Sequence, residues 1–472
     1  MNEKMNSALD EISDQHINEA AQRRYWWFNH LLTAIEKAWH KRWVRRITIA
    51  TAAVLTLALL WNTVAFPVSL PIAAKAVSLA DYSDPNAKYN NDYIEAATQG
   101  LQNFFTESMT QVLSDHNNQN RAFSPMSLYI SLSALAEMTG GDQQVMSVLG
   151  ASDLSELRRQ TTALWNRCST SSNRAKTTLA TSLWIDNSLQ YSQATMDTLA
   201  KEHYTSVYQQ NLSASQADQD IRTWINGQTG GLLKDSASDM GLNPNTVFAF
   251  FSTVYFKAAW GRQFNALQNE IRIFHGAERD ALRTYMCFKE APNKGDEGHD
   301  YFWGEDYGAL YLNTWGAHNM WLILPDEDKT VDDVLASDEW AQMVQGNWDR
   351  DKRKHVFVNL KLPKFDIRDS NSLIPDLKAM GITDVFDPDR ADFTAAFPKS
   401  QGLAYLSEYR QVTRVAIDEE GIYAASYTKG EGELAGEAPT GDKIDFILDR
   451  PFLFVITISN QIPLFAGIVN MP

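Results

Sequence analysis

A stretch of about 28 residues without a charged side chain, from Ile47 to Ala74, divides the chain into a short leading segment and a long body. A helix that crosses a bilayer needs about 20 mostly apolar residues, so this stretch is long enough. Residues 47–60 place apolar side chains on every face of a helix, whereas Pro67 and Pro71 discourage helix further on. A transmembrane helix is therefore favoured over a buried core helix.

The charges on the two sides of the stretch predict its orientation. The nearest charges behind it, apart from Lys75, are Asp81 and Asp84. The positive-inside rule then places the leading segment in the cytoplasm and the body outside the cell. A lead of about 46 residues favours a retained signal anchor, although cleavage near Ala76 and secretion stay open, because Ala74-Lys75-Ala76 has the spacing of a signal-peptidase site. The basic residues ahead of the stretch are Lys37, Lys41, Arg42, Arg45 and Arg46.

These signals divide the chain into four parts. Residues 1–46 form a cytoplasmic basic and aromatic segment, typical of an amphipathic helix beside the membrane, whose function the sequence does not indicate. Residues 47–72 form the transmembrane signal anchor. Residues 73–91 are polar with one proline between 77 and 91 and are expected to be a linker. Residues 92–472 form the exported domain.

Composition excludes several classes of function. The chain of 472 residues carries a net charge of −16, which disfavours nucleic-acid binding and, through self-repulsion, favours a monomer. Its two cysteines are too few for a structural zinc site. Cys168 and Cys287 either form one disulfide or remain as small buried thiols, and the sequence leaves both alternatives open.

Motifs of catalysis are missing from the sequence. It has no Gly-x-Ser-x-Gly elbow, no His-Glu-x-x-His helix and no phosphate-binding loop ending in Lys-Ser or Lys-Thr. The densest polar cluster, residues 295–300, lacks a defined metal spacing and is typical of a solvated loop. We therefore expect no enzyme activity, no metal and no cofactor.

Hydrophobic periodicity changes along the exported domain. Spacings near 3.6 predict helices over 92–113, 127–138, 197–208 and 218–226. Later apolar runs predict strands over 246–257, 320–324 and 355–362, and a hairpin from 452–458 and 464–469. Helices early in the chain and strands late indicate an α+β domain.

The segment from Asp418 to Leu448 has an unusual alternation. Every second residue from Ile422 to Leu434 is small or apolar, and the charges between these two residues all fall on the intervening positions. A strand of this pattern would have one buried face and one solvent-exposed face. Four glycines nevertheless make it a poor permanent strand. The segment is therefore interpreted as a two-state element, with a flexible acidic loop as the alternative.

Around this loop the sequence resembles the serpins. Glu419-Glu420-Gly421, followed by an alanine-rich stretch, is similar to the hinge of the family's reactive loop. Further signatures follow in the family's order over residues 92–472. They are Phe123-Ser124-Pro125-Met126-Ser127-Leu128, Trp224-Ile225-Asn226, Tyr255-Phe256-Lys257 with Trp260 and Phe264, Leu362-Pro363-Lys364-Phe365, Gly381-Ile382-Thr383-Asp384-Val385-Phe386, Arg450-Pro451-Phe452-Leu453-Phe454 and Phe465-Ala466-Gly467-Ile468-Val469-Asn470-Met471-Pro472.

The resemblance implies an α+β serpin fold with three β-sheets, about nine helices and an exposed reactive-centre loop. It also implies a suicide inhibitor of serine proteases. The protease attacks the loop, and the cleaved loop then inserts into the main sheet before the acyl-enzyme is hydrolysed. The alternative is a non-inhibitory relative that acts as a binding, carrier or chaperone-like protein.

The family's spacing assigns roles to loop residues. It places the scissile bond at Ala435-Gly436, with Leu434 as the neighbour of Ala435 and a rival for the specificity position. A small or apolar residue there implies elastase-like or subtilisin-like targets, because the pocket of trypsin-like proteases prefers Arg or Lys. The hinge residues are Glu419, Glu420, Gly421, Ile422, Ala424 and Ala425, where Ile422 replaces the usual small hydroxylated residue.

The resemblance also assigns a central polar cluster, called the shutter, and a residue near the hinge. The shutter residues are Ser124, Ser127, Ser252 and Gln411, the last two standing where the family usually has Asn and His. Trp260, which follows the strand signature Tyr255-Phe256-Lys257, is assigned to the region that the family calls the breach.

Overall fold

The computed structural model describes residues 72–472 with gaps at 83–96, 99, 115–117, 169, 173, 230–240, 244, 292–297, 317, 371, 400–403, 423–441 and 459–460. The predicted cytoplasmic segment and nearly all of the predicted anchor therefore lie outside the described residues. No helix within the described part is long and apolar enough to cross a membrane.

A long mixed sheet forms one half of the body. Its strand order is β1-β5-β4-β6-β14-β13. The two-residue strands β3 (Thr170–Ser171) and β15 (Gly421–Ile422) pair with β4 and β6 respectively. The main strands are β1 (Lys75–Ser78), β4 (Ala175–Asp186), β5 (Thr205–Gln210), β6 (Phe248–Ala259), β13 (Asp366–Asp369) and β14 (Tyr409–Ala416).

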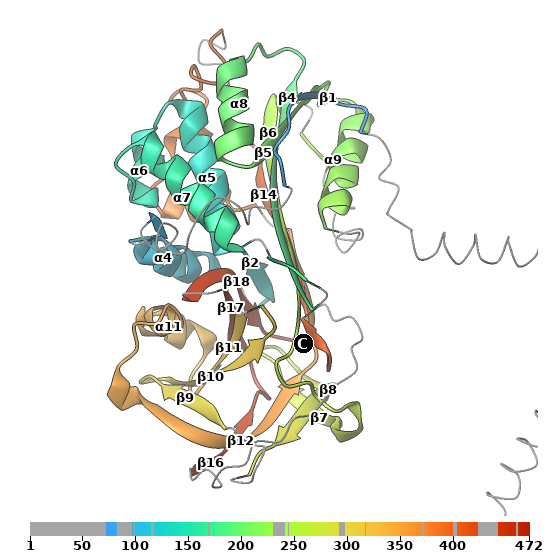
Figure 1. Cartoon of the computed structure of the whole chain (residues 1–472), viewed down its shortest axis with the longest axis vertical. Coiled ribbons are helices and arrows are strands. Elements are labelled where there is room, and N and C mark those ends of the chain that lie inside the picture. The colour runs from blue at the N-terminus through green and yellow to red at the C-terminus, as the bar shows by residue number, and fades with distance from the viewer. Residues whose placement is uncertain are drawn as a thin grey trace, which may run out of the picture. The chain divides into compact units, whose positions relative to one another are not determined.

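Strand β6 is the centre of this sheet. Ten of its twelve residues are buried, since helices cover both faces of the sheet, which explains its nearly continuous apolar sequence. The two faces carry separate clusters, and the smaller one packs Trp184, Tyr208 and Phe251 beneath Trp224 of helix α9 (Ser215–Gln228). Figure 1 shows α9 on one side of the sheet and, on the other, the group α5 (Pro125–Thr139), α6 (Gln143–Leu149), α7 (Leu154–Cys168) and α8 (Gln193–Glu202).

The second sheet is built mostly from the later half of the chain. Its order is β2-β18-β17-β11-β10-β9-β12-β8-β7, and β16 pairs with β12. Strand β12 pairs with β9 through its first residues and with β8 through its last, so two of the three expected sheets are continuous here. The strands are β2 (Arg121–Phe123), β7 (Glu270–His275), β8 (Asp280–Lys289), β9 (His299–Trp303), β10 (Tyr307–Thr314), β11 (His318–Pro325), β12 (Arg353–Pro363), β16 (Asp442–Ile447), β17 (Phe452–Ile458) and β18 (Ile462–Val469).

Nine α-helices lie within the described residues. The most buried is α5, which Ser124 caps by accepting a hydrogen bond from the Ser127 amide, and which ends at Gly140 with φ of 72°. The helices are α4 (Gln102–Leu113), α5 (Pro125–Thr139), α6 (Gln143–Leu149), α7 (Leu154–Cys168), α8 (Gln193–Glu202), α9, α10 (Val331–Leu335), α11 (Glu339–Val344) and α12 (Ile374–Ala379).

The α+β class and most predicted elements are confirmed, with three differences. The helix expected over 197–208 ends at Glu202, because Tyr204 takes a φ of 48° and residues 205–210 pair with β4. The helix expected over 92–113 is interrupted at Gly100, with φ of 94°: residues 97 and 98 are helical, α4 begins at Gln102, and residues 92–96 lie outside the described residues. Cys168 and Cys287 are buried and unpaired.

The third difference concerns the expected linker. Residues 72–82 lie on the body, where β1 pairs antiparallel with β5. The Ala74 amide donates to Asp220 Oδ2 at 2.9 Å, and the Tyr82 hydroxyl donates to the Thr181 carbonyl at 3.0 Å. The folded domain therefore begins before residue 92, and the rest of the expected linker lies outside the described residues.

Candidate functional site

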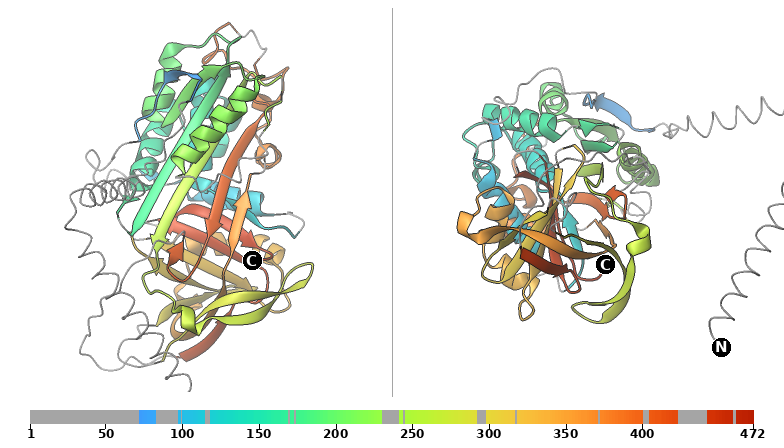
Figure 2. Two further views of the ribbon diagram at one scale, coloured as in Figure 1. Left: turned by 90° about the vertical axis from the view of Figure 1, so that its right-hand side faces the viewer. Right: turned by 60° about the horizontal axis from the view of Figure 1, so that its bottom comes forward.

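An open slot beside β6 is the main feature of the candidate site. Strand β14 runs parallel to β6 and pairs only with residues 250–253. Strand β15 pairs with Ala258 and Ala259. Between these contacts, no described strand pairs with β6 residues 254–257 on that side, although β4 pairs with all of them on the other. Figure 2 shows β14 leaving the side of β6 toward the second sheet.

The predicted hinge lies at the mouth of this slot. The chain leaves β14, reverses at residues 418–420 and returns as β15, antiparallel to β6. Asp418 stabilises the reversal, because its Oδ1 accepts hydrogen bonds from the amides of Glu420 and Gly421. Ile422 is fully buried, as the alternation predicts. The first two residues of a further strand are thus already in place.

Gly421 approaches the backbone of β6 very closely. A Cβ atom at this position would lie 2.2 Å from the Ala258 carbonyl oxygen and 2.8 Å from the Ala259 Cα. Neither atom belongs to a flexible side chain that could turn away. The hinge can therefore pair with β6 only if residue 421 has no side chain.

Trp260 and Phe264 hold the reversal from the end of β6. The Trp260 indole donates to the Asp418 carbonyl at 2.7 Å, and its backbone amide donates to the Glu420 carbonyl at 3.0 Å. The Phe264 amide donates to the Glu419 carbonyl at 3.1 Å. The structure thus brings Trp260 into direct contact with the hinge.

An ion pair fixes the hinge to the second sheet. Lys364 Nζ lies 2.5 Å from Glu419 Oε1, and the Asn269 side-chain amide donates to the same oxygen. Burial favours a raised pKa for Glu419, but the hydrogen bonds from Lys364 and Asn269 outweigh it, so the pKa lies below its usual value. Sequence reasoning named neither partner as a site residue, although Lys364 belongs to one of the quoted signatures.

The four shutter residues meet below the slot. The Ser124 amide donates to Gln411 Oε1, and Gln411 Nε2 donates to the Ser124 carbonyl at 3.1 Å, so Gln411 joins α5 to β14. Ser252 stands opposite Gln411 in the β6–β14 register, with a buried hydroxyl that has no hydrogen-bond partner among the described residues. A new strand inserted between β6 and β14 would separate Ser252 from Gln411.

A second contact between α5 and β14 was missed by the sequence reasoning. The hydroxyl groups of Ser131 and Tyr409 lie 2.7 Å apart, and both residues are buried. The remaining predicted site residues, Ala424, Ala425, Leu434, Ala435 and Gly436, lie outside the described residues. Among those that are described, no group of three side chains is arranged to hold a metal ion.

Comparison with known proteins now decides the family. A model of the family described as "Serpin (serine protease inhibitor)" matches residues 75–472, more than half of the chain. The chain is a serpin. It therefore belongs to a family of protease inhibitors rather than of catalytic enzymes. The family match begins at residue 75, in β1, which agrees with the early start of the folded domain.

Relatives and structural neighbours of this serpin include a plasminogen activator inhibitor and a thyroxine-binding globulin. Plasminogen activator inhibitor 1 of Sus scrofa is 25% identical over 82% of this chain and 95% of its own length. The native structure of the thermophilic serpin tengpin has a TM-score of 0.70 at 22% identity, covering 84% of this chain and all of that one. A structure of thyroxine-binding globulin with thyroxine has a TM-score of 0.67 at 19% identity, covering 79% and 99%. The serpin fold is thus confirmed.

Proposed function

We propose that this serpin is a suicide-substrate inhibitor of elastase-like or subtilisin-like serine proteases. The observation that carries the proposal is the slot beside β6, with the buried hinge residues Gly421 and Ile422 already paired at its mouth. Because the first residues of the loop already pair with β6, the residues that follow can add to the same strand in register. After cleavage, insertion then competes with hydrolysis of the acyl-enzyme.

The register of β15 supports the assignment of the loop. If the pairing of Ile422 with Ala258 continues without a shift, Ala424 pairs with Phe256 and residue 432 pairs with Phe248, the first residue of β6. The proposed scissile bond, Ala435-Gly436, then follows three residues later. A loop cut there is just long enough to fill β6 and carry the attached protease past its far end.

We also propose that the body is exported and held at the membrane by residues 47–72. Lys75 of β1 pairs with Gln209 of β5. Gln209 in turn pairs with Ile185 of β4, and Ile185 pairs with Phe248, the first residue of β6. The hinge lies ten residues further along β6, about 33 Å away. Within the body, the chain segment that precedes β1 therefore lies at the end of β6 remote from the hinge. Figure 1 shows β1 and β16 at opposite ends of the body.

The inhibitory mechanism is tested by incubating the full chain with an elastase, a subtilisin and trypsin. We expect a covalent complex that survives SDS with the first two and little with trypsin, because the loop offers a small apolar residue at the scissile bond. Mass spectrometry of the released peptide should give Gly436 as its first residue. Clean cleavage without a trapped species would refute inhibition.

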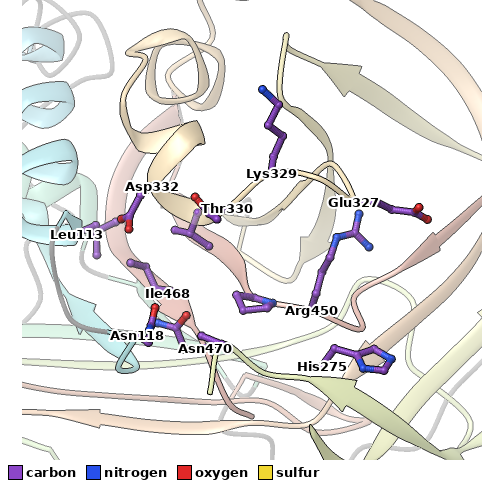
Figure 3. A pocket seen from close by; sticks show the side chains of 13 residues that line it. Leu113, Asn118, His275, Glu327, Lys329, Thr330, Asp332, Arg450, Ile468 and Asn470 are labelled. Atoms are coloured by element: carbon purple, nitrogen blue, oxygen red, sulfur yellow. The ribbon is translucent and has the colours of Figure 1, made fainter. Parts of the chain in front are cut away.

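A second candidate function is ligand carriage, favoured by one cavity. A pocket of about 420 Å³ lies between the end of α4, the β7–β8 turn, the segment before α10 and the end of β18. Apolar and charged side chains share its lining, and Figure 3 shows Arg450, Lys329 and Asp332 around it. This candidate predicts that the cut loop gives no trapped protease and that a hydrophobic dye is displaced from the pocket by a ligand.

A further inference from the structure

The pocket between the end of α4, the β7–β8 turn, the segment before α10 and the end of β18 has an apolar wall. Leu113, Val331 and Ile468 line it, and all three residues are buried. Its volume of about 420 Å³ lies in the range of about 300–1,000 Å³ that small-ligand sites occupy. The wall can therefore cover the aliphatic part of a small ligand.

Free hydrogen-bond acceptors lie on one side of this pocket. The Asp332 carboxylate is exposed and has no hydrogen-bond or ion-pair partner among the described residues. Asn470 is only 9% exposed, and its side-chain nitrogen donates to the Gln119 carbonyl, but no described group donates to its Oδ1. Figure 3 shows Asp332 and Asn470 on the same side, with Ile468 between them. An N–H group of a ligand would satisfy either acceptor.

Free hydrogen-bond donors lie across the pocket, on Arg450. Its Nε and Nη2 donate to the Pro325 carbonyl at 3.1 and 2.7 Å, and its Nη1 donates to Asp449 at 3.1 Å. These bonds use three of the five N–H groups of a guanidinium, so two remain for a ligand. Figure 3 shows Arg450 on the side opposite Asp332.

The other charged side chains of the lining are paired or point elsewhere. Lys329 and His275 each have a carboxylate partner, at 2.7 and 3.1 Å. Figure 3 shows Lys329 and Glu327 pointing away from the other labelled residues. Asp332 and Arg450 are therefore the charged groups that remain for a ligand.

A ligand that matches this arrangement has a positive end, a negative end and an apolar body. An ammonium group fits Asp332, a carboxylate fits the guanidinium of Arg450, and an amide N–H fits Asn470 Oδ1. A short peptide of apolar residues with free termini carries all of these groups. A simple amine or a fatty acid would leave one of the two charged side chains without a partner.

We propose that this pocket binds a short peptide of apolar residues, about the size of a dipeptide, with its amino terminus at Asp332 and its carboxyl terminus at Arg450. The inference rests on the second candidate function, ligand carriage, and names the class of ligand that the pocket takes. It does not depend on the inhibitory function, because none of the pocket residues belongs to the hinge or the slot.

Titration calorimetry of the full chain with leucyl-leucine tests the proposal, and one site should saturate. N-acetyl-leucyl-leucine lacks the ammonium group and leucyl-leucine amide lacks the carboxylate. Each should bind about fivefold more weakly, as expected for the loss of one partly exposed ion pair. Glycyl-glycine, which has no apolar side chain, should show no measurable binding.

Variants of the chain assign the two ends of the peptide. Asp332→Asn should weaken leucyl-leucine about fivefold and leave N-acetyl-leucyl-leucine unchanged, since that probe has no ammonium group to lose. Arg450→Gln should be selective in the same way for the amidated probe. The matched control is Asp328→Asn, because Asp328 is exposed in the same segment but does not line the pocket. That variant should bind leucyl-leucine as the wild type does.

Four outcomes would overturn the inference. If leucyl-leucine does not saturate the chain by about 1 mM, but another compound displaces a hydrophobic dye, the ligand class is wrong and ligand carriage survives. A chain that binds neither dye nor peptide refutes both. Equal affinity for leucyl-leucine and either blocked analogue refutes recognition of both termini. Binding that is unchanged in Asp332→Asn and Arg450→Gln places the peptide elsewhere, such as in the slot beside β6. The analogues need no variant, so a folding defect in Arg450→Gln would leave the test intact.

Discussion

At the scale of single residues, Gly421 is the position where adding a single methyl group should most disturb the hinge. We expect Gly421→Ala to expel the hinge from β6, because the added Cβ would meet the Ala258 carbonyl oxygen at 2.2 Å. The loss of stability should be about 1–3 kcal/mol. Hydrogen exchange of the peptide that spans residues 417–422 should become faster.

The control for this prediction is Gly227→Ala in α9. An added Cβ there meets nothing within 4 Å, so the variant should be neutral or slightly more stable, as alanine favours helix. Equal exchange in the Gly421→Ala variant and the wild type would show that the hinge is not paired with β6 in solution.

Acid should loosen the same hinge through Glu419. Its folded pKa lies below the usual value of 4.5, because Lys364 and Asn269 outweigh the effect of burial. A carboxyl with a lowered folded pKa stabilises the folded state above its unfolded pKa, and this contribution is lost as the pH falls through the folded value. The protection factors of the hinge amides, which compare their exchange with that of an unfolded chain at the same pH, should therefore fall below about pH 4.5 in the wild type. Glu419→Gln should remove most of this pH dependence, and an identical profile in that variant would contradict the assignment.

The sequence could identify the hinge but not its partners. The alternation predicts that Ile422 points inward, and the structure confirms its burial. Lys364 and Asn269 lie 55 and 150 residues away from Glu419 along the chain, and only the packing of two sheets brings them together. The sequence pattern around residue 419 carries no signal for such contacts.

At the scale of elements, the loop should tolerate charge on one face only. In the proposed register Ala424 pairs with Phe256, which is buried, whereas Ala425 pairs with the partly exposed Tyr255. We expect Ala424→Arg to slow insertion and convert the inhibitor into a substrate, because it places a charge in the core. Ala425→Arg is the matched control and should keep inhibition.

The ratio of cleaved chain to covalent complex on SDS gels measures how often the acyl-enzyme is hydrolysed before the loop inserts. The ratio should rise at least severalfold for Ala424→Arg and little for Ala425→Arg. Equal ratios in the two variants would refute the register, and a reversed order would shift it by one residue.

Elements were predicted well where periodicity is strong and poorly where tertiary pairing decides. The apolar run of β6 and the β17–β18 hairpin follow from sequence alone. Residues 205–208 fit a helical spacing, yet they form β5 because β4 offers a parallel partner. Segment 75–78 is too short to show a pattern, and it forms β1 only because β5 leaves an edge open.

At the scale of the whole molecule, the intact fold should be less stable than the cleaved one. Filling the slot with about a dozen residues forms a similar number of backbone hydrogen bonds at about 1 kcal/mol each. For a domain of this size, a gain of about 10 kcal/mol raises the melting temperature by roughly 10 °C. Calorimetry before and after loop cleavage measures this rise, and no rise would mean that the strand does not insert.

The central claim is that, after cleavage, β6 gives up its pairing with β14 and pairs with the inserted loop instead. The most direct measurement is a crystal structure of the chain cut after Ala435. The account predicts a new strand between β6 and β14, with Ala424 opposite Phe256 and the pairs from Tyr409–Phe250 to Val412–Thr253 separated. If β14 still pairs with β6 and residues 423–435 lie outside the sheet, the account is wrong.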